Sequence, residues 1–412
     1  MFGLSASLTA GGQAHRATHG ARETALPSMP EPMPSVAILR QRYSAYGGGE
    51  EIIRQAADLL TQQGLADICV VTRGWSDRQT SGVRTLVCDP PHFGRLLREI
   101  TFCRKSLPMA RRHCQLVQSH ERIPGADIYR AGDGVYRRWI ENYSRVLPPW
   151  RRWTLHASPF HRLAMAYERA IYASPLLRAV IANSQMVADD IAEFFPHVRQ
   201  KVRVIWNGVD CERFHPGLRN AHRAAVLERH GLSPQSRIAL FLGSGWVRKG
   251  LSTAIAAIAG TPPDSILLVV GRDRRQPRFV DLADRLGVSE RVIFAGARRD
   301  PASYIGCADA LVLPSIYDPM PNSCLEALAA GVPVLASSRT GVRDLLVAGS
   351  CGLVRDPFET TSWSNALTEA LSDEARAKMG SAGRVVALEH SMHRMVSAWM
   401  DLYRELLADT TR

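Results

Sequence analysis

Residues 310–336 read ALVLPSIYDPMPNSCLEALAAGVPVLA and contain three segments with different patterns. The apolar run 310–313 predicts a short buried strand, and a second run at 333–336 predicts another. Between them, residues 323–330 predict a helix that ends at Gly331, because glycine is common just after the last helical residue. Strand, loop, helix and strand in this order predict a parallel sheet with crossover helices.

The same alternation continues through the C-terminal half of the chain. Apolar runs predict strands at 237–242, 265–270 and 292–294, and helical periodicity predicts helices at 251–259 and 280–286. Together with residues 310–336, these segments predict one doubly wound α/β domain.

The N-terminal half begins with a second series of the same kind. The glycines at 47–49 separate a strand from an amphipathic helix that ends near Gly64, and a further strand follows. Ser184 is expected to cap a later helix. The strands predicted in this half are 36–39, 68–72, 179–182 and 202–205. A strand, a glycine loop, a helix and a strand open a doubly wound sheet, so we expect two such domains.

A chain of 412 residues is long enough for two domains of ordinary size. Residues 1–34 are rich in Gly, Ala, Ser, Pro and His and are expected to be a disordered leader. We predict an N-terminal Rossmann-like domain at 35–205 and a C-terminal one at 206–389. The final amphipathic helix, within 390–412, is expected to return to the N-terminal domain.

The composition favours anionic partners and a reducing compartment. The formal net charge is +12, which suits phosphates, phosphorylated glycans, nucleic acid or an acidic membrane face. The eight cysteines form no C-x-x-C pair and no zinc pattern, which favours core thiols in the cytoplasm. No apolar run approaches the length of a membrane span, and no signal peptide is recognised.

Two carboxylates in the quoted stretch are candidate ligand-binding groups. Asp318 precedes a proline in a loop, and Glu326 is expected in the first turn of the helix. A purely structural alternative is open, since Ser323 and Glu326 fit a capping box and Asp318 can start a turn. The functional interpretation is that free N–H groups at the helix start bind a diphosphate while a carboxylate accepts hydrogen bonds from hydroxyls.

The segment Gly243–Gly250 reads GSGWVRKG and follows a predicted strand. It has neither the Walker A spacing nor a clean G-x-G-x-x-G pattern. Arg248 and Lys249 stand side by side where a helix begins, and cations there oppose the helix dipole. An anion between them would offset that cost; a solvated basic turn is the alternative.

The order of these motifs resembles the family 4 retaining glycosyltransferases, from about residue 36 onward. The resemblance rests on the glycine loop with Arg-Lys, on the two-carboxylate stretch, and on the linking segments around residues 207–216. It implies the GT-B fold, in which two doubly wound domains face each other across a cleft. A narrower resemblance, in residues 123–129 and 133–136, is to the lipopolysaccharide-core glucosyltransferases of the WaaG type.

The resemblance implies specific roles at the donor site. Arg248 and Lys249 match the pair that binds the donor diphosphate, and Glu326 matches the carboxylate that binds ribose. Asp318 stands where the family usually has a glutamate near the donor sugar. His120 matches a histidine that contacts the sugar, although a lone histidine is more often structural, and Asp133 is a competing acceptor-side candidate. The remaining implied donor contacts are Gly48, Gly49, Gly245, Met320, Asn322 and Ser323.

The implied reaction is transfer of a sugar from a nucleotide-diphosphate sugar, such as UDP-glucose, to a glycan or glycolipid, with no metal and no other cofactor. The leaving diphosphate itself is expected to take the acceptor proton on the same face of the sugar. Two alternatives remain: a GT-B nucleotide-sugar epimerase, and a catalytically silent sugar-nucleotide binding protein. The aspartate at position 318, where the family usually has a glutamate, is the feature that leaves the silent binding protein as an alternative.

The middle of the chain, about 95–180, is expected to be helical and is strongly basic, with interleaved aromatic residues. One interpretation is a solvated helical surface. The other is an acceptor site for a phosphorylated glycolipid on a surface that binds the anionic inner face of the cell membrane. Nucleic acid is not expected as a partner, because no nucleic-acid motif accompanies the charge.

Overall fold

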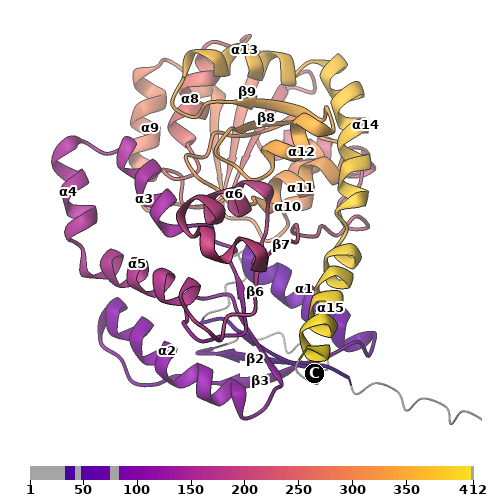
Figure 1. Ribbon diagram of the computed structural model, residues 1–412. Coiled ribbons are helices and arrows are strands. Elements are labelled where there is room, and N and C mark those ends of the chain that lie inside the picture. The colour runs from indigo at the N-terminus through magenta and orange to yellow at the C-terminus, as the bar shows by residue number, and fades with distance from the viewer. Residues whose placement is uncertain (1–32, 42–47, 75–82, 410–412) are drawn as a thin grey trace, which may run out of the picture. The chain divides into compact units, whose positions relative to one another are not determined.

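The computed structural model describes residues 33–41, 48–74 and 83–409, and the chain there forms two parallel β-sheets with connecting helices (Figure 1). The predicted leader lies outside these residues, except for residues 33 and 34. The first sheet has seven strands in the order β3-β2-β1-β4-β5-β6-β7, and the second has six in the order β10-β9-β8-β11-β12-β13. Every strand pair is parallel.

The strands of the first sheet are β1 (Ser35–Leu39), β2 (Asp67–Thr72), β3 (Arg84–Val87), β4 (Leu116–Ser119), β5 (Ile128–Arg130), β6 (Ala179–Ala182) and β7 (Val202–Val204). The helices up to β7 are α1 (Gly48–Gln62), α2 (Gly94–Arg111), α3 (Tyr136–Arg145), α4 (Pro149–Ala157), α5 (Pro159–Tyr172) and α6 (Gln185–Phe194).

The strands of the second sheet are β8 (Arg237–Leu242), β9 (Ser265–Val270), β10 (Val292–Gly296), β11 (Ala310–Leu313), β12 (Val334–Ser337) and β13 (Gly352–Arg355). The helices of the second half are α7 (Leu218–Arg229), α8 (Leu251–Ala259), α9 (Gln276–Arg285), α10 (Pro301–Cys307), α11 (Asn322–Ala329), α12 (Arg343–Ala348), α13 (Thr361–Ala370), α14 (Asp373–Glu389) and α15 (Met392–Ala408).

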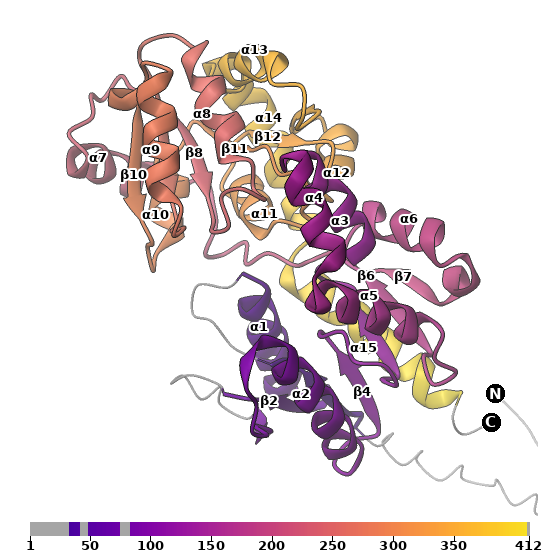
Figure 2. The ribbon, with the colours of Figure 1, turned by 90° about the vertical axis from the view of Figure 1, so that its left-hand side faces the viewer.

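Alternate residues of the first sheet face opposite layers, as the two-residue period of a strand requires. Val36 and Ile38 of β1 pack in a cluster with apolar residues of α1 and α15, whereas Ala37 and Leu39 pack with residues of α2. Figures 1 and 2 show α15 beside α1. The final helix therefore completes the core of the first sheet.

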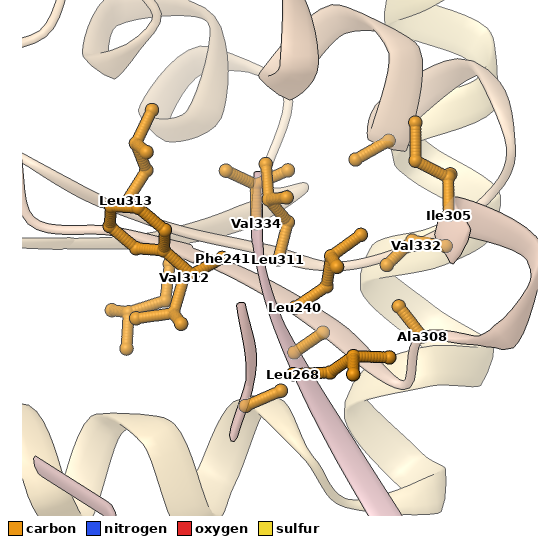
Figure 3. Packing of buried hydrophobic residues seen from close by; sticks show 14 of the residues in the cluster. Leu240, Phe241, Leu268, Ile305, Ala308, Leu311, Val312, Leu313, Val332 and Val334 are labelled. Carbon is orange, nitrogen blue, oxygen red and sulfur yellow. The ribbon is translucent and has the colours of Figure 1, made fainter. Parts of the chain in front are cut away.

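The core of the second sheet consists mainly of aliphatic side chains, together with fully buried aromatic residues such as Phe241, Trp246 and Trp363. Figure 3 shows residues of β8, β9, β11 and β12 packed together with Ile305 and Ala308. Leu240, Phe241, Leu311 and Leu313 have no measurable exposure. Strands buried on both faces lose the alternation of polar and apolar residues, which is why the sequence shows them as continuous apolar runs.

The prediction that residues 95–180 are helical is wrong in two places. The short strands β4 and β5 lie in this region, between α2 and α3. Both are fully buried, yet they include the polar residues Gln118, Ser119 and Arg130. Three or four residues without an apolar run carry too little periodicity to identify a strand from sequence.

The two sheets divide between β7, which ends at Val204, and β8, which begins at Arg237. The domain boundaries given above stay a prediction. Ser184 caps α6 by accepting a hydrogen bond from the Val187 amide, which confirms that part of the sequence interpretation.

Candidate donor-binding site

The loop after β8 and the loop after β11 bring two cations onto one carboxylate. Arg248 Nη1 lies 3.1 Å and Lys249 Nζ 3.0 Å from the same oxygen, Oδ2 of Asp318. The Asp318 side chain is only 9% exposed and that of Lys249 12%, so this ion pair is shielded from water, whereas the Arg248 side chain is 36% exposed. The structure therefore brings these three candidate residues together, in a mutual contact that the sequence did not predict.

Close backbone contacts hold these two loops together. The Ile316 amide donates to the Arg248 carbonyl at 2.9 Å. A Cβ atom at Gly250 would lie 1.9 Å from the Pro314 carbonyl oxygen, and one at Gly243 would lie 2.7 Å from Lys249 Cε. Both glycines also have positive φ angles, of 77° and 139°. The glycine loop thus makes room for the Lys249 side chain and for the second loop.

The electrostatics of this cluster favour an ionised Asp318. Burial alone would raise the pKa of its carboxyl, but the charges of Lys249 and Arg248 and their hydrogen bonds outweigh burial and lower the pKa. Two cations and one carboxylate leave one positive charge. The cluster is therefore a cationic site that suits an anionic ligand, which would compete with the Asp318 carboxylate for the two cations.

Helix α11 begins one residue earlier than expected, and this changes the roles of its first residues. Its N-cap is Pro321, which makes no side-chain capping bond. Ser323 is then the second helical residue and its Oγ has no hydrogen-bond partner among the described residues. The capping-box alternative for Ser323 and Glu326 is therefore wrong, and Glu326 lies in the second turn rather than the first.

The start of α11 is linked by Asn207 to the first sheet. Asn207 Nδ2 donates to Asn322 Oδ1 at 2.8 Å and to the carbonyl of buried Met320 at 3.4 Å. Its Oδ1 accepts a hydrogen bond from Nη2 of Arg130, at the end of β5. The sequence analysis included Asn207 in a linking motif without giving it a role, and it did not single out Arg130, because β5 is too short to be recognised from sequence.

Glu326 is partly buried, and burial raises the pKa of its carboxyl to about 7. The nearby charge of Glu51 on α1 raises it further, whereas Arg213 and Lys249 lower it. Because the charge of Glu51 acts on Glu326, helix α1 lies within electrostatic range of α11. Gly48 and Gly49, two of the predicted donor contacts, form the start of α1.

This pKa predicts a pH-dependent affinity for nucleotide sugar. A carboxylate accepts two hydroxyl hydrogen bonds, whereas its protonated form accepts fewer. Because burial raises the folded-state pKa, the contribution of this carboxyl to folding stability is fully present below its ordinary pKa of 4.5 and is lost as pH rises to about 7. We therefore expect the affinity for a nucleotide sugar to rise several-fold from pH 6 to pH 8, measured by calorimetry.

A nucleotide sugar is the right ligand for this measurement, because its diphosphate is a diester and does not titrate in that range. Glu326→Gln should flatten the pH profile. A profile with the same slope in the variant would assign the titration to another group.

The other two sequence candidates lie where β4 and β5 end. His120 follows β4 and is 6% exposed, with its Nε2 2.7 Å from Gln118 Nε2. Burial, together with the charges of Arg130 and Arg40, lowers the pKa of His120 well below its ordinary value, so the ring is neutral. Asp133 is exposed and lies 3.8 Å from Arg122 Nη1. The carboxyl ends of adjacent parallel strands share one sheet edge, where α/β proteins bind ligands.

Asp133 is also electrostatically connected to the cation pair. Desolvation would raise the pKa of its carboxyl, but the charges of Arg122, Arg40 and Arg248 lower it overall. The candidates from the two sheets therefore influence one another. Gly245 lies in the glycine loop with a φ of 73° and open space around it.

Tyr317, next to Asp318, is a residue that sequence reasoning missed. It is 1% exposed and packs in a cluster with residues of β5, β6 and α6. Its hydroxyl donates to Asp190 Oδ2 at 2.9 Å and accepts from the Val135 amide at 3.0 Å. Tyr317 therefore anchors the Asp318 loop to the first sheet. A buried tyrosine gives no sequence signal that separates this role from ordinary core packing.

The described part of the chain contains neither a membrane-spanning helix nor a cluster of metal-ligating side chains. No helix among residues 33–41, 48–74 and 83–409 is long and apolar enough to cross a membrane. In the same part of the chain, no group of three or more His, Cys, Asp or Glu side chains is arranged to hold a metal ion.

Two parallel sheets of seven and six strands, connected by helices, have the architecture of the GT-B fold. Comparison with known families agrees. Residues 46–213 match the family described as Glycosyltransferase Family 4, and residues 223–386 match Glycosyl transferases group 1. The chain belongs to the family 4 glycosyltransferases.

Individual relatives point to more than one substrate. The chain is 26% identical over 265 residues to the lipopolysaccharide glucosyltransferase WaaG of Escherichia coli, covering 62% of this chain and 68% of WaaG. It is 26% identical over 395 residues to a D-inositol 3-phosphate glycosyltransferase of Corynebacterium urealyticum, covering 87% and 91%. This chain matches only 57% and 56% of the lengths of two further D-inositol 3-phosphate glycosyltransferases.

Solved structures share the fold. A crystal structure of WaaG aligns with a TM-score of 0.76 at 22% identity, over 89% of this chain and 99% of that one. Anabaena HepE, solved with UDP and glucose, aligns with a TM-score of 0.69 at 19% identity, over 90% and 100%.

Proposed function

We propose that this protein is a retaining, metal-independent glycosyltransferase that moves a sugar from a nucleotide-diphosphate sugar to a glycan or glycolipid. One observation carries the proposal: Arg248 and Lys249 both lie within about 3 Å of one carboxylate oxygen of Asp318, four residues before α11 begins. Paired cations and free amides at a helix start suit a diphosphate. Solved HepE with UDP and glucose supports UDP-glucose as the first donor to test.

In the proposed reaction, the bond between the sugar's anomeric carbon and the diphosphate oxygen breaks, and its electron pair leaves with the diphosphate. The acceptor hydroxyl oxygen bonds to that carbon on the same face, and its proton passes to a departing diphosphate oxygen. Arg248 and Lys249 stabilise the charge that develops on the leaving group, in place of a metal. Glu326 binds the ribose, and His120 contacts the sugar.

The acceptor is proposed to be anionic, which suits a phosphorylated glycolipid of a surface polysaccharide such as the lipopolysaccharide core. Arg130 is 6% exposed, its Nε has no hydrogen-bond partner, and no carboxylate of the described residues lies within ion-pair distance of it. Burial lowers the pKa of its guanidinium to about 10. A buried cation without a carboxylate in direct contact is costly, so an anionic group bound there would offset that cost.

The test is incubation with a panel of nucleotide sugars and detection of the products. Slow release of free nucleotide without acceptor supports a transferase. Formation of an epimeric nucleotide sugar would identify an epimerase instead, and binding without turnover would identify a silent binding protein.

We also propose that helix α4 binds the anionic inner face of the cell membrane. Trp150 and Trp153 are 68% and 74% exposed, an unusual state for tryptophan, and Arg151 and Arg152 lie between them. Tryptophan prefers the membrane interface, and arginine is attracted by anionic lipid.

Replacing both tryptophans by alanine should therefore reduce binding to vesicles containing anionic phosphatidylglycerol by about tenfold or more in a flotation assay. The control is Trp206→Ala, away from α4. Equal binding of the α4 variant and the unchanged protein would contradict the membrane proposal.

A further inference from the structure

A polar residue in the core of the first sheet connects His120 to the last helix of the chain. Gln118 lies on β4 and has no measurable exposure. Its register partners on the neighbouring strands are the apolar residues Ile38 and Ile128. A buried amide among apolar neighbours is costly unless its hydrogen bonds are satisfied.

Both of the hydrogen bonds found for Gln118 connect it to other functional elements. Tyr403 of α15 donates from its hydroxyl to Gln118 Oε1 at 2.9 Å. On the other side, Gln118 Nε2 lies 2.7 Å from His120 Nε2. Residues 118 and 120 are two apart, so a strand directs both side chains to the same face. The result is a continuous path from Tyr403 through Gln118 to His120.

The direction of these hydrogen bonds fixes the protonation of the histidine ring. Since the tyrosine hydroxyl donates to the amide oxygen, the amide nitrogen faces the ring and donates to Nε2. Nε2 must then be the unprotonated nitrogen, and the proton of the neutral ring lies on Nδ1. His120 Nδ1 is buried and has no hydrogen-bond partner among the described residues. A buried donor of this kind is available for a ligand.

Packing keeps the ring in this orientation. Trp399, one turn before Tyr403 on α15, meets the His120 ring edge to face, with ring centroids 5.8 Å apart and an interplanar angle of 72°. Trp399 and Tyr403 have no measurable exposure. The final helix therefore supplies both the hydrogen bond and the aromatic contact that position the residue expected to touch the sugar.

We propose that Tyr403 and Gln118 are positioning residues that hold His120 as the Nδ1–H tautomer, so that Nδ1 donates a hydrogen bond to a hydroxyl of the donor sugar. This inference rests on the proposed function for the identity of the ligand, but not for the tautomer. It assigns to the last helix a part in sugar recognition.

The tautomer is measured first, in the full chain without ligand. Nitrogen-15 NMR of labelled histidine distinguishes the two neutral forms, and His120→Gln assigns the signal. We expect the Nδ1–H form in the unchanged protein and a mixture of both forms in Tyr403→Phe and in Gln118→Leu. A pure Nε2–H form in the unchanged protein would overturn the proposal. Tyr403→Phe keeps the aromatic ring and its packing, so this variant still tests the tautomer if Gln118→Leu fails to fold.

The second measurement compares the affinity for UDP-glucose with that for UDP. Tyr403→Phe should lower the affinity for UDP-glucose about three- to tenfold, roughly the loss of one hydrogen bond, and leave that for UDP unchanged. Leu402→Ala removes core packing from the same helix without touching Gln118, and it should not change the ratio of the two affinities.

A parallel loss of both affinities in Tyr403→Phe would show a merely structural role and overturn the inference. Failure of the unchanged protein to bind any nucleotide would reject the proposed function. The tautomer would still be readable in that case, so the two failures are distinguishable.

Discussion

Replacing Lys249 by alanine is expected to lower sugar transfer by about 10²–10³-fold, the usual cost of removing one preorganised group that stabilises a leaving oxyanion. Lys249 Nζ contacts Asp318 at 3.0 Å, and its side chain is 12% exposed, so the charge acts in a poorly solvated site. Donor turnover in the presence of acceptor, or nucleotide release without it, is the measurement.

The variant should fold normally, because Asp318 keeps Arg248 as a partner at 3.1 Å. Thermal unfolding checks this. Lys378→Ala, which removes an exposed lysine of α14, serves as the matched control and should retain full activity. Undiminished turnover in a correctly folded Lys249→Ala protein would reject the phosphate role of this residue.

Replacing Asp318 by asparagine is expected to separate binding from turnover. Its carboxylate shares the two cations that the diphosphate is proposed to use, so neutralising it should raise the affinity for UDP about tenfold, or about 1.4 kcal/mol. Turnover should fall at least about tenfold, because Lys249 loses the partner that orients its amine and the product diphosphate leaves more slowly.

Asp318→Glu restores the residue usual in the family and is the control. It should keep the UDP affinity near that of the unchanged protein, since the charge remains. Calorimetric titration with UDP separates the cases: equal affinity in Asp318→Asn and the unchanged protein would mean that the diphosphate does not compete with this carboxylate.

The strands of the second sheet could be predicted because burial on both faces produces continuous apolar runs, as at residues 237–242 and 265–270. The strands β4 and β5 could not, because three or four residues with polar members give no period. Yet these two strands place His120 and Arg130. Because β4 and β5 were not predicted, the sequence did not show that His120 and Arg130 lie near each other at one sheet edge. His120 itself was named only from the family resemblance.

At the site, residue types and their order identified Arg248, Lys249, Asp318 and Glu326. Their geometry depends on side-chain contacts between loops about 70 positions apart, which no local pattern encodes. The contact of both cations with Asp318 is an example, and so is the anchoring of Tyr317 by Asp190 and Val135. The early start of α11 follows from Pro321 as its N-cap, which moved Ser323 out of the capping position.

A crystal structure of the protein with bound UDP is the most direct test of the central claim, that the loops after β8 and β11 form the diphosphate site. We expect phosphate oxygens within hydrogen-bond distance of Lys249 Nζ, Arg248 and the first amides of α11, with the ribose hydroxyls on Glu326. Nucleotide density that contacts neither Lys249 nor Glu326 would contradict it.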